Sequence, residues 1–439
     1  MTTRILVVDD SVVIRKLVTS TLSEVRGMEV VATAATGKIA LAKIQQCSPD
    51  IVILDVEMPD MDGIETLQHI RKLAPRLPVI MFSTKTERGA VATIEALTRG
   101  ASDYVTKPSN VGNVLVAMAR VREDLVPKIQ ALTGGVRGPR KPPSSPAASL
   151  AKAATSSTTQ IRTVPIATTM PLPTTSATPT TGKATTGTSS TTSSSSTAGT
   201  SPLSRMTTQV IARSQVTASN PVIVLDGPVR LHRSTAPRPP VEIIAIGAST
   251  GGPNALAELL AQLPEEFPVP IVIVQHMLAT FTRHFAERLA AQCRIKIVEA
   301  NAGDTVAPGH AYIARGDYHL MTVRRLGRTS LAMNQEVAEN FCRPAVDVLF
   351  RSIAHTHGAG ALAVVLTGMG HDGLRGCGAI RDAGGDVIVQ DEQSSVVWGM
   401  PGFVARAGLA SQVLALDQLA SELRRRVGPG APRAAGAVP

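Results

Sequence analysis

A serine in a glycine-rich stretch is the residue of this 439-residue chain best suited to do chemistry. The residues Gly247-Ala248-Ser249-Thr250-Gly251 match G-x-S-x-G, in which a sharp strand-to-helix turn lifts a serine hydroxyl above the edge of a sheet. Pro253 suits the first turn of the following helix, whose free N–H groups can stabilise an oxyanion. A phosphate-binding loop is the alternative, but the stretch has neither G-x-G-x-x-G spacing nor a Walker lysine.

Two further polar residues follow apolar runs in the same half of the chain. His276 comes after VPIVIVQ, and Asp372 comes after ALAVVLT. A nucleophilic serine needs a base, and the base needs an orienting carboxylate. Alone, His276 could be a capping or core residue, Asp372 could be a turn residue, and His371 is a rival base. Because the carboxyl ends of parallel strands meet at one edge, the sequence favours a triad of Ser249, His276 and Asp372.

A second group of polar residues lies near the N-terminus. Asp9, Asp10, Asp55, Ser83 and Lys107 each come at or just after the end of an apolar run. Three carboxylates at one edge repel each other unless a hard cation is present, which predicts Mg²⁺. A lysine and a hydroxyl beside them could bind phosphoryl oxygens, so that Asp55 would form an acyl phosphate. A loop or capping role explains any one of these residues, but not all five together.

The elements that must position these residues follow an alternating pattern. In residues 1–125, short apolar runs alternate with stretches of helical periodicity, and the pattern resumes in residues 240–427. Near-continuous apolar strands between helices are typical of parallel sheets covered on both faces. The sequence therefore predicts an α/β protein with two doubly wound parallel-sheet domains.

Residues 126–239 differ in composition from both flanking regions. Ser and Thr make up 27 of the 50 residues from 151 to 200, and twelve basic residues accompany one acid between residues 126 and 240. Such a segment cannot bury enough apolar surface to offset the entropy of ordering it, which predicts a disordered basic linker. Residues 428–439 are expected to be a disordered tail. The net charge of +10 thus lies in the linker and does not indicate a nucleic-acid-binding domain.

Composition and spacing also restrict the cellular setting. The four cysteines are scattered without a C-x-x-C pair, which argues against a disulfide framework and a zinc site and fits a reducing cytosol. The N-terminus does not match a signal peptide, and no apolar run reaches the roughly 18 residues of a membrane span. We expect a cytoplasmic protein without membrane insertion.

Residues 1–125 resemble a two-component receiver domain of flavodoxin-like fold through VVDDS, LDVEMPDMDG, MFST and YVTKP. The resemblance implies that Asp55 accepts phosphate from a chemotaxis histidine kinase, with Mg²⁺ as the cofactor. The implied metal ligands are Asp9, Asp10, Asp55 and the backbone carbonyl of Glu57. The implied switch residues are Ser83, Tyr104 and Lys107. A cis peptide bond before Pro108 is implied as well.

Residues 240–427 resemble the catalytic domain of chemotaxis protein-glutamate methylesterases, which implies a Rossmann-like fold. The matching stretches are AIGASTGGP, VIVQHM, FTRHFAERL, RPAVDVLF, LTGMGHDG and VVWGMP. By this resemblance Ser249, His276 and Asp372 are the catalytic triad, and Thr250 and Met369 line the oxyanion region. The order Ser…His…Asp differs from the Ser…Asp…His order of α/β-hydrolases, so that fold is not expected.

The resemblance implies a phosphorylation-regulated serine hydrolase without a cofactor in the esterase domain. Its substrates would be glutamate γ-methyl esters of methyl-accepting chemotaxis receptors, with deamidation of receptor glutamines as a second activity. One feature departs from the family pattern, because the linker of more than a hundred residues exceeds the usual short one.

Two other classes of function remain as alternatives at this stage. A receiver commonly controls a DNA-binding output, but no helix-turn-helix pattern is visible and the C-terminal region is nearly neutral. A non-catalytic nucleotide-binding module would need a phosphate loop. DNA-binding and nucleotide-titration assays distinguish these alternatives from an esterase.

Overall fold

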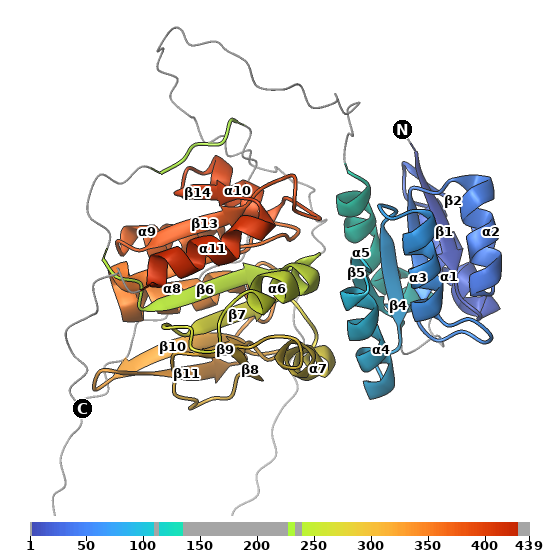
Figure 1. Cartoon of the computed structure of the whole chain (residues 1–439). Coiled ribbons are helices and arrows are strands. Elements are labelled where there is room, and N and C mark those ends of the chain that lie inside the picture. Colours follow the sequence, from blue (N-terminus) through green and yellow to red (C-terminus); the bar gives the residue numbers. More distant parts are fainter. Residues whose placement is uncertain (1, 109–113, 135–226, 233–238, 429–439) are drawn as a thin grey trace, which may run out of the picture. The chain divides into compact units, whose positions relative to one another are not determined.

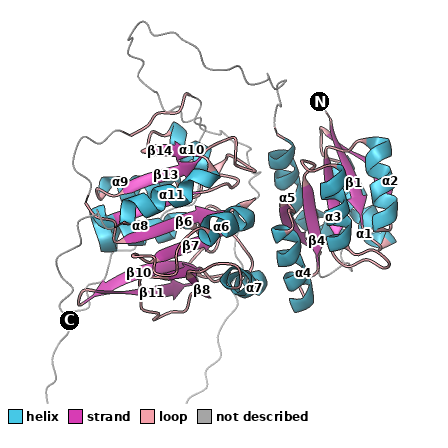
Figure 2. Ribbon diagram, in the orientation of Figure 1, coloured by secondary structure: helices cyan, strands magenta, loops and turns pink. Residues whose placement is uncertain are grey.

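The computed structural model describes residues 2–108, 114–134, 227–232 and 239–428. These described residues fall into one compact unit. Two separate parallel sheets organise them, each flanked by helices (Figures 1 and 2). The prediction of two doubly wound α/β domains is thereby confirmed. Most of the predicted linker and nearly all of the predicted tail lie outside the described residues.

The N-terminal sheet has the strand order β2-β1-β3-β4-β5 and is parallel throughout. Its strands are β1 (Thr3–Val8), β2 (Met28–Ala34), β3 (Ile51–Asp55), β4 (Val79–Ser83) and β5 (Asp103–Thr106). Its helices are α1 (Val12–Ser23), α2 (Gly37–Cys47), α3 (Gly63–Leu73), α4 (Glu87–Thr98) and α5 (Val114–Thr133). The strand order reverses between β1 and β3, and at such a switch point the loops at the carboxyl ends diverge and leave a crevice.

Local sequence explains why these helices begin where they do. Four of them follow a side chain that accepts a backbone N–H of the first turn, which satisfies a group that the helix leaves unpaired. These capping residues are Ser11, Thr36, Asp62 and Thr86. Helix α5 continues eight residues beyond the predicted domain end at residue 125, because Ile129 and Leu132 are buried against the same core as Leu125.

The C-terminal sheet has seven parallel strands in the order β14-β13-β12-β6-β7-β9-β8. The strands are β6 (Ile243–Ala248), β7 (Ile271–Gln275), β8 (Lys296–Glu299), β9 (His310–Ile313), β12 (Ala361–Val365), β13 (Asp386–Gln390) and β14 (Gln412–Leu414). The helices are α6 (Gly252–Ala261), α7 (Ala279–Ala290), α8 (Val346–His357), α9 (Leu374–Asp382), α10 (Met400–Arg406) and α11 (Leu416–Val427), with the short 3₁₀ helix η1 (Gly358–Gly360). Among the described helices, none is long and apolar enough to cross a membrane.

The sequence pattern did not reveal one part of this half. Strands β10 (His319–Arg325) and β11 (Arg328–Asn334) form an antiparallel hairpin apart from the main sheet. Leu326 and Gly327 connect the two strands, and both have positive φ. This backbone conformation is typical of the two-residue hairpin turns whose twist matches that of the strands. Such a turn is recognised from Asn-Gly or Asp-Gly, so Leu-Gly between arginines gave no clear signal.

The predicted linker is ordered at both of its described ends. Residues 126–133 continue helix α5, and His232 donates its backbone N–H to the Ala410 carbonyl at 2.8 Å. Residues 227–232 therefore contact the C-terminal half, although their composition resembles that of the linker.

Candidate active site and phosphorylation site

Three neighbouring parallel strands bring Ser249, His276 and Asp372 to one edge of the C-terminal sheet. Strand β6 pairs with β7 on one side and with β12 on the other, and each of the three residues follows one of these strands. The Nε2 atom of His276 lies 2.7 Å from Oδ2 of Asp372. The rival His371 instead contacts the ring of Phe403 edge to face. Of the two histidines, His276 is therefore the one oriented by a carboxylate.

Asp372 is held rigidly and stays ionised. Besides His276 it accepts hydrogen bonds from four groups, the backbone N–H of Val346, Asp347 and Gly373 and the side-chain amide of Asn340. Burial alone would raise the pKa of this carboxyl, but His276 and the N–H groups of Val346 and Asp347 outweigh burial and lower the pKa below its usual value. An ionised, fixed carboxylate can hold the imidazole in one orientation.

Ser249 lies in a turn that only glycine neighbours permit. Gly251 has φ of 78°, and a Cβ there would lie 2.6 Å from Val396 side-chain atoms. A Cβ on Gly368 would lie 2.8 Å from Cβ of Ser249, so the loop after β12 can approach the serine only because this residue lacks a side chain. These close approaches place the half-buried Ser249 beside the loop that carries Asp372.

Cys342 occupies the place next to His276 where the serine hydroxyl is expected. Its Sγ lies 3.5 Å from Nδ1 of His276, the ring nitrogen that Asp372 leaves available. Among the described residues, no hydrogen bond joins the Ser249 hydroxyl to His276. Such contacts are often loose before substrate binds and tighten in the complex with substrate.

The predicted oxyanion region offers backbone N–H groups rather than side chains. Within the described part of the chain, the N–H groups of Thr250 and Met369 make no hydrogen bond. The Thr250 hydroxyl is engaged elsewhere, since it donates to Oδ2 of Asp103 at 2.6 Å. Helix α6 begins two residues after Thr250, so the positive end of its dipole lies close to the Thr250 N–H in the chain. The arrangement suits a developing negative charge on an acyl oxygen.

In the N-terminal half, Lys107 joins two buried carboxylates. Its Nζ lies 2.8 Å from Oδ2 of Asp9 and 2.7 Å from Oδ2 of Asp55, and each carboxylate is 1% exposed. Burial, and then the neighbouring Asp9, raise the pKa of Asp55 to about 6 despite Lys107. The carboxylates of Asp9, Asp10 and Asp55 lie within 4.8 Å of one another. Buried, mutually repelling oxygen ligands of this kind fit Mg²⁺.

The other predicted receiver residues surround this cluster less directly. Glu57 donates its N–H to Asp55 Oδ1 at 3.2 Å, whereas the Ser83 hydroxyl donates to the Gly89 carbonyl at 3.0 Å. Tyr104 is buried, and its hydroxyl accepts the N–H of Leu278 at 3.3 Å. Among the described residues the cis peptide bond precedes Pro344 and not Pro108, so the expectation for Pro108 was wrong.

The raised pKa of Asp55 predicts that Mg²⁺ binding at this cluster depends on pH. Because the folded state holds the proton of Asp55 more tightly than the unfolded chain does, this proton stabilises the fold. The stabilisation is fully present below the ordinary pKa of 3.8 and is lost as the pH rises through about 6. Above pH 6 the charged cluster therefore opposes folding, and Mg²⁺ should relieve that repulsion. We expect Mg²⁺ to raise the melting temperature at pH 7.5 and to do so much less at pH 5.5. Thermal unfolding with and without Mg²⁺ measures this, and Asp9→Asn should reduce the effect.

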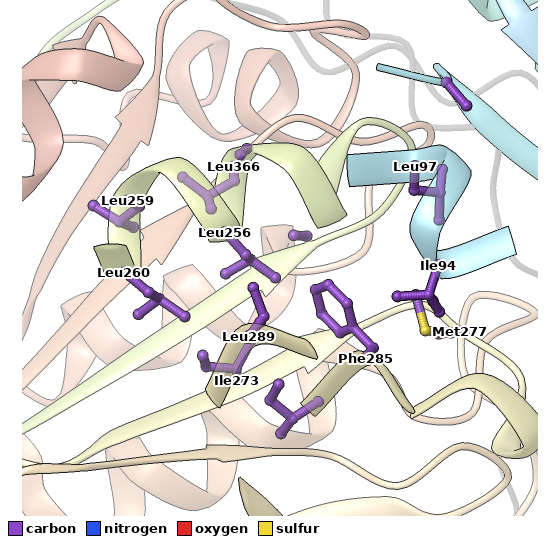
Figure 3. Close-up of a cluster of buried hydrophobic side chains, with 14 of the residues drawn as sticks. Ile94, Leu97, Leu256, Leu259, Leu260, Ile273, Met277, Phe285, Leu289 and Leu366 are labelled. Carbon is purple, nitrogen blue, oxygen red and sulfur yellow. The ribbon is translucent and has the colours of Figure 1, made fainter. Parts of the chain in front are cut away.

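Residues at the start of α7 contact residues of β5 and α4 within the compact unit. The rings of Tyr104 and Phe281 have centroids 4.7 Å apart, and Leu278, which bonds Tyr104, comes two residues after His276. Ile94 and Leu97 belong to the same buried cluster as Phe285 (Figure 3). The predicted switch residue Tyr104 thus touches the segment that carries the candidate base.

The sequence did not single out two supporting residues. The side-chain amide of Asn340 donates hydrogen bonds to the carboxylates of both Asp347 and Asp372. The buried Asp347 in turn accepts the N–H of Gly376, so the two residues hold the loop that carries Asp372. Asp347 lies in RPAVDVLF, a stretch used for the family resemblance, and that match was the available signal. Cys342 stands immediately before the same stretch.

Comparisons with known proteins match both halves of the chain. The model for the response regulator receiver domain matches residues 5–119, and the model for CheB methylesterase matches residues 244–423. A protein-glutamate methylesterase/protein-glutamine glutaminase of Trichodesmium erythraeum is 43% identical over 97% of this chain and 99% of its own length. A protein of the same name from Nocardioides sp. is 42% identical over 97% of this chain and 95% of its own length. The crystal structure of the Thermotoga maritima CheB methylesterase catalytic domain is 39% identical over 42% of this chain and 98% of that structure, with a TM-score of 0.42.

These matches also bear on the linker. Because one alignment covers almost all of both proteins, that relative is about as long as this chain, and a long linker is not a departure peculiar to this protein. The relatives match from the receiver to the esterase domain at 42 to 43% identity. The chain therefore belongs to the family of protein-glutamate methylesterases/protein-glutamine glutaminases, in which a response regulator receiver domain precedes a CheB methylesterase domain.

Proposed function

We propose that this protein is a serine hydrolase that removes methyl groups from glutamate γ-methyl esters of methyl-accepting chemotaxis receptors. The observation that carries the proposal is the His276–Asp372 pair beside Ser249, at the shared edge of β6, β7 and β12. The curated relatives are also named as glutaminases, which supports deamidation of receptor glutamines as a second activity. The proposed place of work is the cytoplasm, on the cytoplasmic parts of the receptors.

In the proposed reaction Ser249 attacks the ester carbonyl and gives its proton to Nδ1 of His276. Asp372, bonded to Nε2, stabilises the imidazolium that forms. The oxyanion is held by the N–H groups of Thr250 and Met369. Methanol leaves with the proton from His276, and a water molecule then cleaves the acyl-enzyme by the same route, which leaves a glutamate carboxylate. No cofactor takes part in these steps.

The receiver domain is proposed to regulate this reaction through phosphorylation of Asp55 by a chemotaxis histidine kinase. The ligands proposed for Mg²⁺ are Asp9, Asp10, Asp55 and the carbonyl of Glu57. Bound there, Mg²⁺ would neutralise charge on the transferring phosphoryl group. Lys107 is positioned to bind a phosphoryl oxygen, since its ammonium contacts Asp55. Ser83 and Tyr104 are the proposed switch residues, and the contact of Tyr104 with Leu278 supports a route to His276.

Release of methanol from methylated receptors tests the proposal. The purified chain should release methanol from receptor-containing membranes, and acetyl phosphate with Mg²⁺ should raise the rate. Glutamine-containing receptors, assayed for ammonia, test the second activity separately. Absence of methanol release both with and without the phosphodonor would contradict the esterase assignment.

The pH dependence should expose the influence of Cys342 on the base. Burial lowers the pKa of His276, but Cys342 and Asp372 together outweigh burial and raise it above its ordinary value of 6.5. Only the neutral imidazole can accept the serine proton, so activity should rise with pH. We expect Cys342→Ala to move the acidic limb of the kcat/KM profile toward lower pH. An unchanged limb in this variant would show that the thiol does not act on the base.

A further inference from the structure

The thiol of Cys342 and the imidazole of His276 have the geometry of a metal-binding pair. Their atoms Sγ and Nδ1 lie 3.5 Å apart. A tetrahedral Zn²⁺ with bonds of about 2.3 Å to sulfur and 2.0 Å to nitrogen holds such atoms about 3.5 Å apart. An ion could therefore enter between them without a large movement of either side chain.

The surroundings of His276 match those of a histidine that binds zinc. In such sites the ring nitrogen away from the metal donates to a carboxylate, which fixes the tautomer and strengthens the ligand. Asp372 makes this contact to Nε2 at 2.7 Å, which leaves Nδ1 for the ion. A thiolate and an imidazole select zinc rather than Mg²⁺, which prefers oxygen.

A strained turn presents Cys342 to the imidazole. Glu339 and Cys342 exchange backbone hydrogen bonds of 3.1 and 2.9 Å, and Asn340 and Phe341 between them both have positive φ. A phenylalanine rarely adopts this backbone, and such strain persists only where the surrounding structure enforces it. Glu339 also forms a double hydrogen bond with Arg351, so the turn is held from outside.

The same turn contributes an oxygen that lacks a partner. Oδ1 of Asn340 is buried and accepts no hydrogen bond from the described residues. The amide nitrogen of this side chain bonds Asp372 at 2.8 Å, which places the oxygen close to the His276–Asp372 pair. A buried carbonyl oxygen without a donor is costly unless water or a cation satisfies it. This second observation points to a bound species close to the Asp372 carboxylate that orients His276.

We propose that His276 and Cys342 form an inhibitory Zn²⁺ site in the esterase domain. On binding, Zn²⁺ takes the lone pair of Nδ1 and replaces the thiol proton of Cys342, which goes to solvent, with no change of oxidation state. Water completes the coordination. Inhibition rests on the proposed esterase function, because the ion occupies the nitrogen that must accept the Ser249 proton. Cysteine spacing did not reveal this site, since its ligands come from separate segments.

Cobalt spectroscopy tests the site without reference to activity. The full-length chain is freed of metal, kept in excess Mg²⁺ to fill the receiver cluster, and titrated with Co²⁺. We expect a thiolate-to-cobalt charge-transfer band in the near ultraviolet that saturates at one ion per chain. Cys342→Ser should lose the band, whereas Cys293→Ser should keep it, because burial raises the pKa of that thiol to about 11. Ser249→Ala should also keep it, so the site can stand even if the esterase proposal fails.

Zinc titration of methanol release tests the consequence. Zn²⁺ should inhibit the wild type and the Cys293→Ser control equally, and EDTA should restore activity. Loss of a residue that only hydrogen-bonds a metal ligand typically weakens metal binding roughly 10- to 100-fold. Loss of the ligand itself in Cys342→Ser should therefore raise the Zn²⁺ concentration for half inhibition by at least this factor. Absence of the cobalt band in the wild type overturns the site. Zinc inhibition of undiminished potency in Cys342→Ser overturns the inhibitory role.

Discussion

Ser249→Ala is expected to lower kcat/KM for receptor demethylation by about 10⁴-fold or more while leaving the fold intact. The serine is half-buried at the end of β6, beside the carboxylate-bound His276, and its backbone turn needs glycine at position 251 rather than the serine hydroxyl. Alanine therefore removes the nucleophile and little else. Methanol release gives the rate, and circular dichroism with thermal unfolding reports on the fold.

A double variant makes this test sharper. Residues that act as a unit in catalysis show losses that do not add. His276→Ala combined with Ser249→Ala should thus be no slower than Ser249→Ala alone. Ser421→Ala, on the exposed side of α11, is the matched control and should retain the wild-type rate. Wild-type activity in Ser249→Ala, or strictly additive losses in the double variant, would rule out the triad.

Asp55→Asn is expected to abolish both phosphoryl incorporation and the stimulation of the esterase by acetyl phosphate. Asp55 is the carboxylate that meets Lys107 at 2.7 Å and lies in the cluster that fits Mg²⁺. An amide cannot form the acyl phosphate, so the stimulated rate should fall to the unstimulated one. Asp60→Asn is the control, because this exposed residue has φ of 68°, which asparagine tolerates well. Stimulation that survives in Asp55→Asn would place the phosphorylated residue elsewhere.

Deletion of the receiver separates inhibition of the esterase from its activation. If the receiver restrains the esterase through the contact of Tyr104 with Leu278, removing residues 1–134 should raise the unstimulated rate. The cut follows helix α5, which ends at Thr133. One face of the seven-stranded sheet keeps a core of its own, but the other belongs to a cluster shared with Ile94 and Leu97, so circular dichroism must show that the truncated chain folds. A truncated enzyme no faster than the unphosphorylated full-length chain would leave activation as the role of the receiver.

Local sequence patterns are enough to identify the residues that lie at the ends of strands. Runs such as ILVV before Asp9 and IIAI before the Ser249 loop are local patterns, and strand and helix periods can be read from them. Parallel strands then bring their carboxyl ends to one edge, so the sequence could predict the clusters around Asp55 and Ser249 before any contact was known. The two α/β domains followed from the same alternation.

The contacts between the polar atoms of the site depend on how distant segments pack. Asn340 and Asp372 are 32 residues apart, and His276 and Asp372 are 96 apart, yet they bond at 2.8 and 2.7 Å. Such bonds depend on packing between distant segments, and no local period encodes them. The contact between Cys342 and His276 has the same origin, since it requires a strained turn to meet the loop after β7. Side-chain type and strand position are local properties, whereas the assembled fold determines which atoms contact the two ring nitrogens of His276.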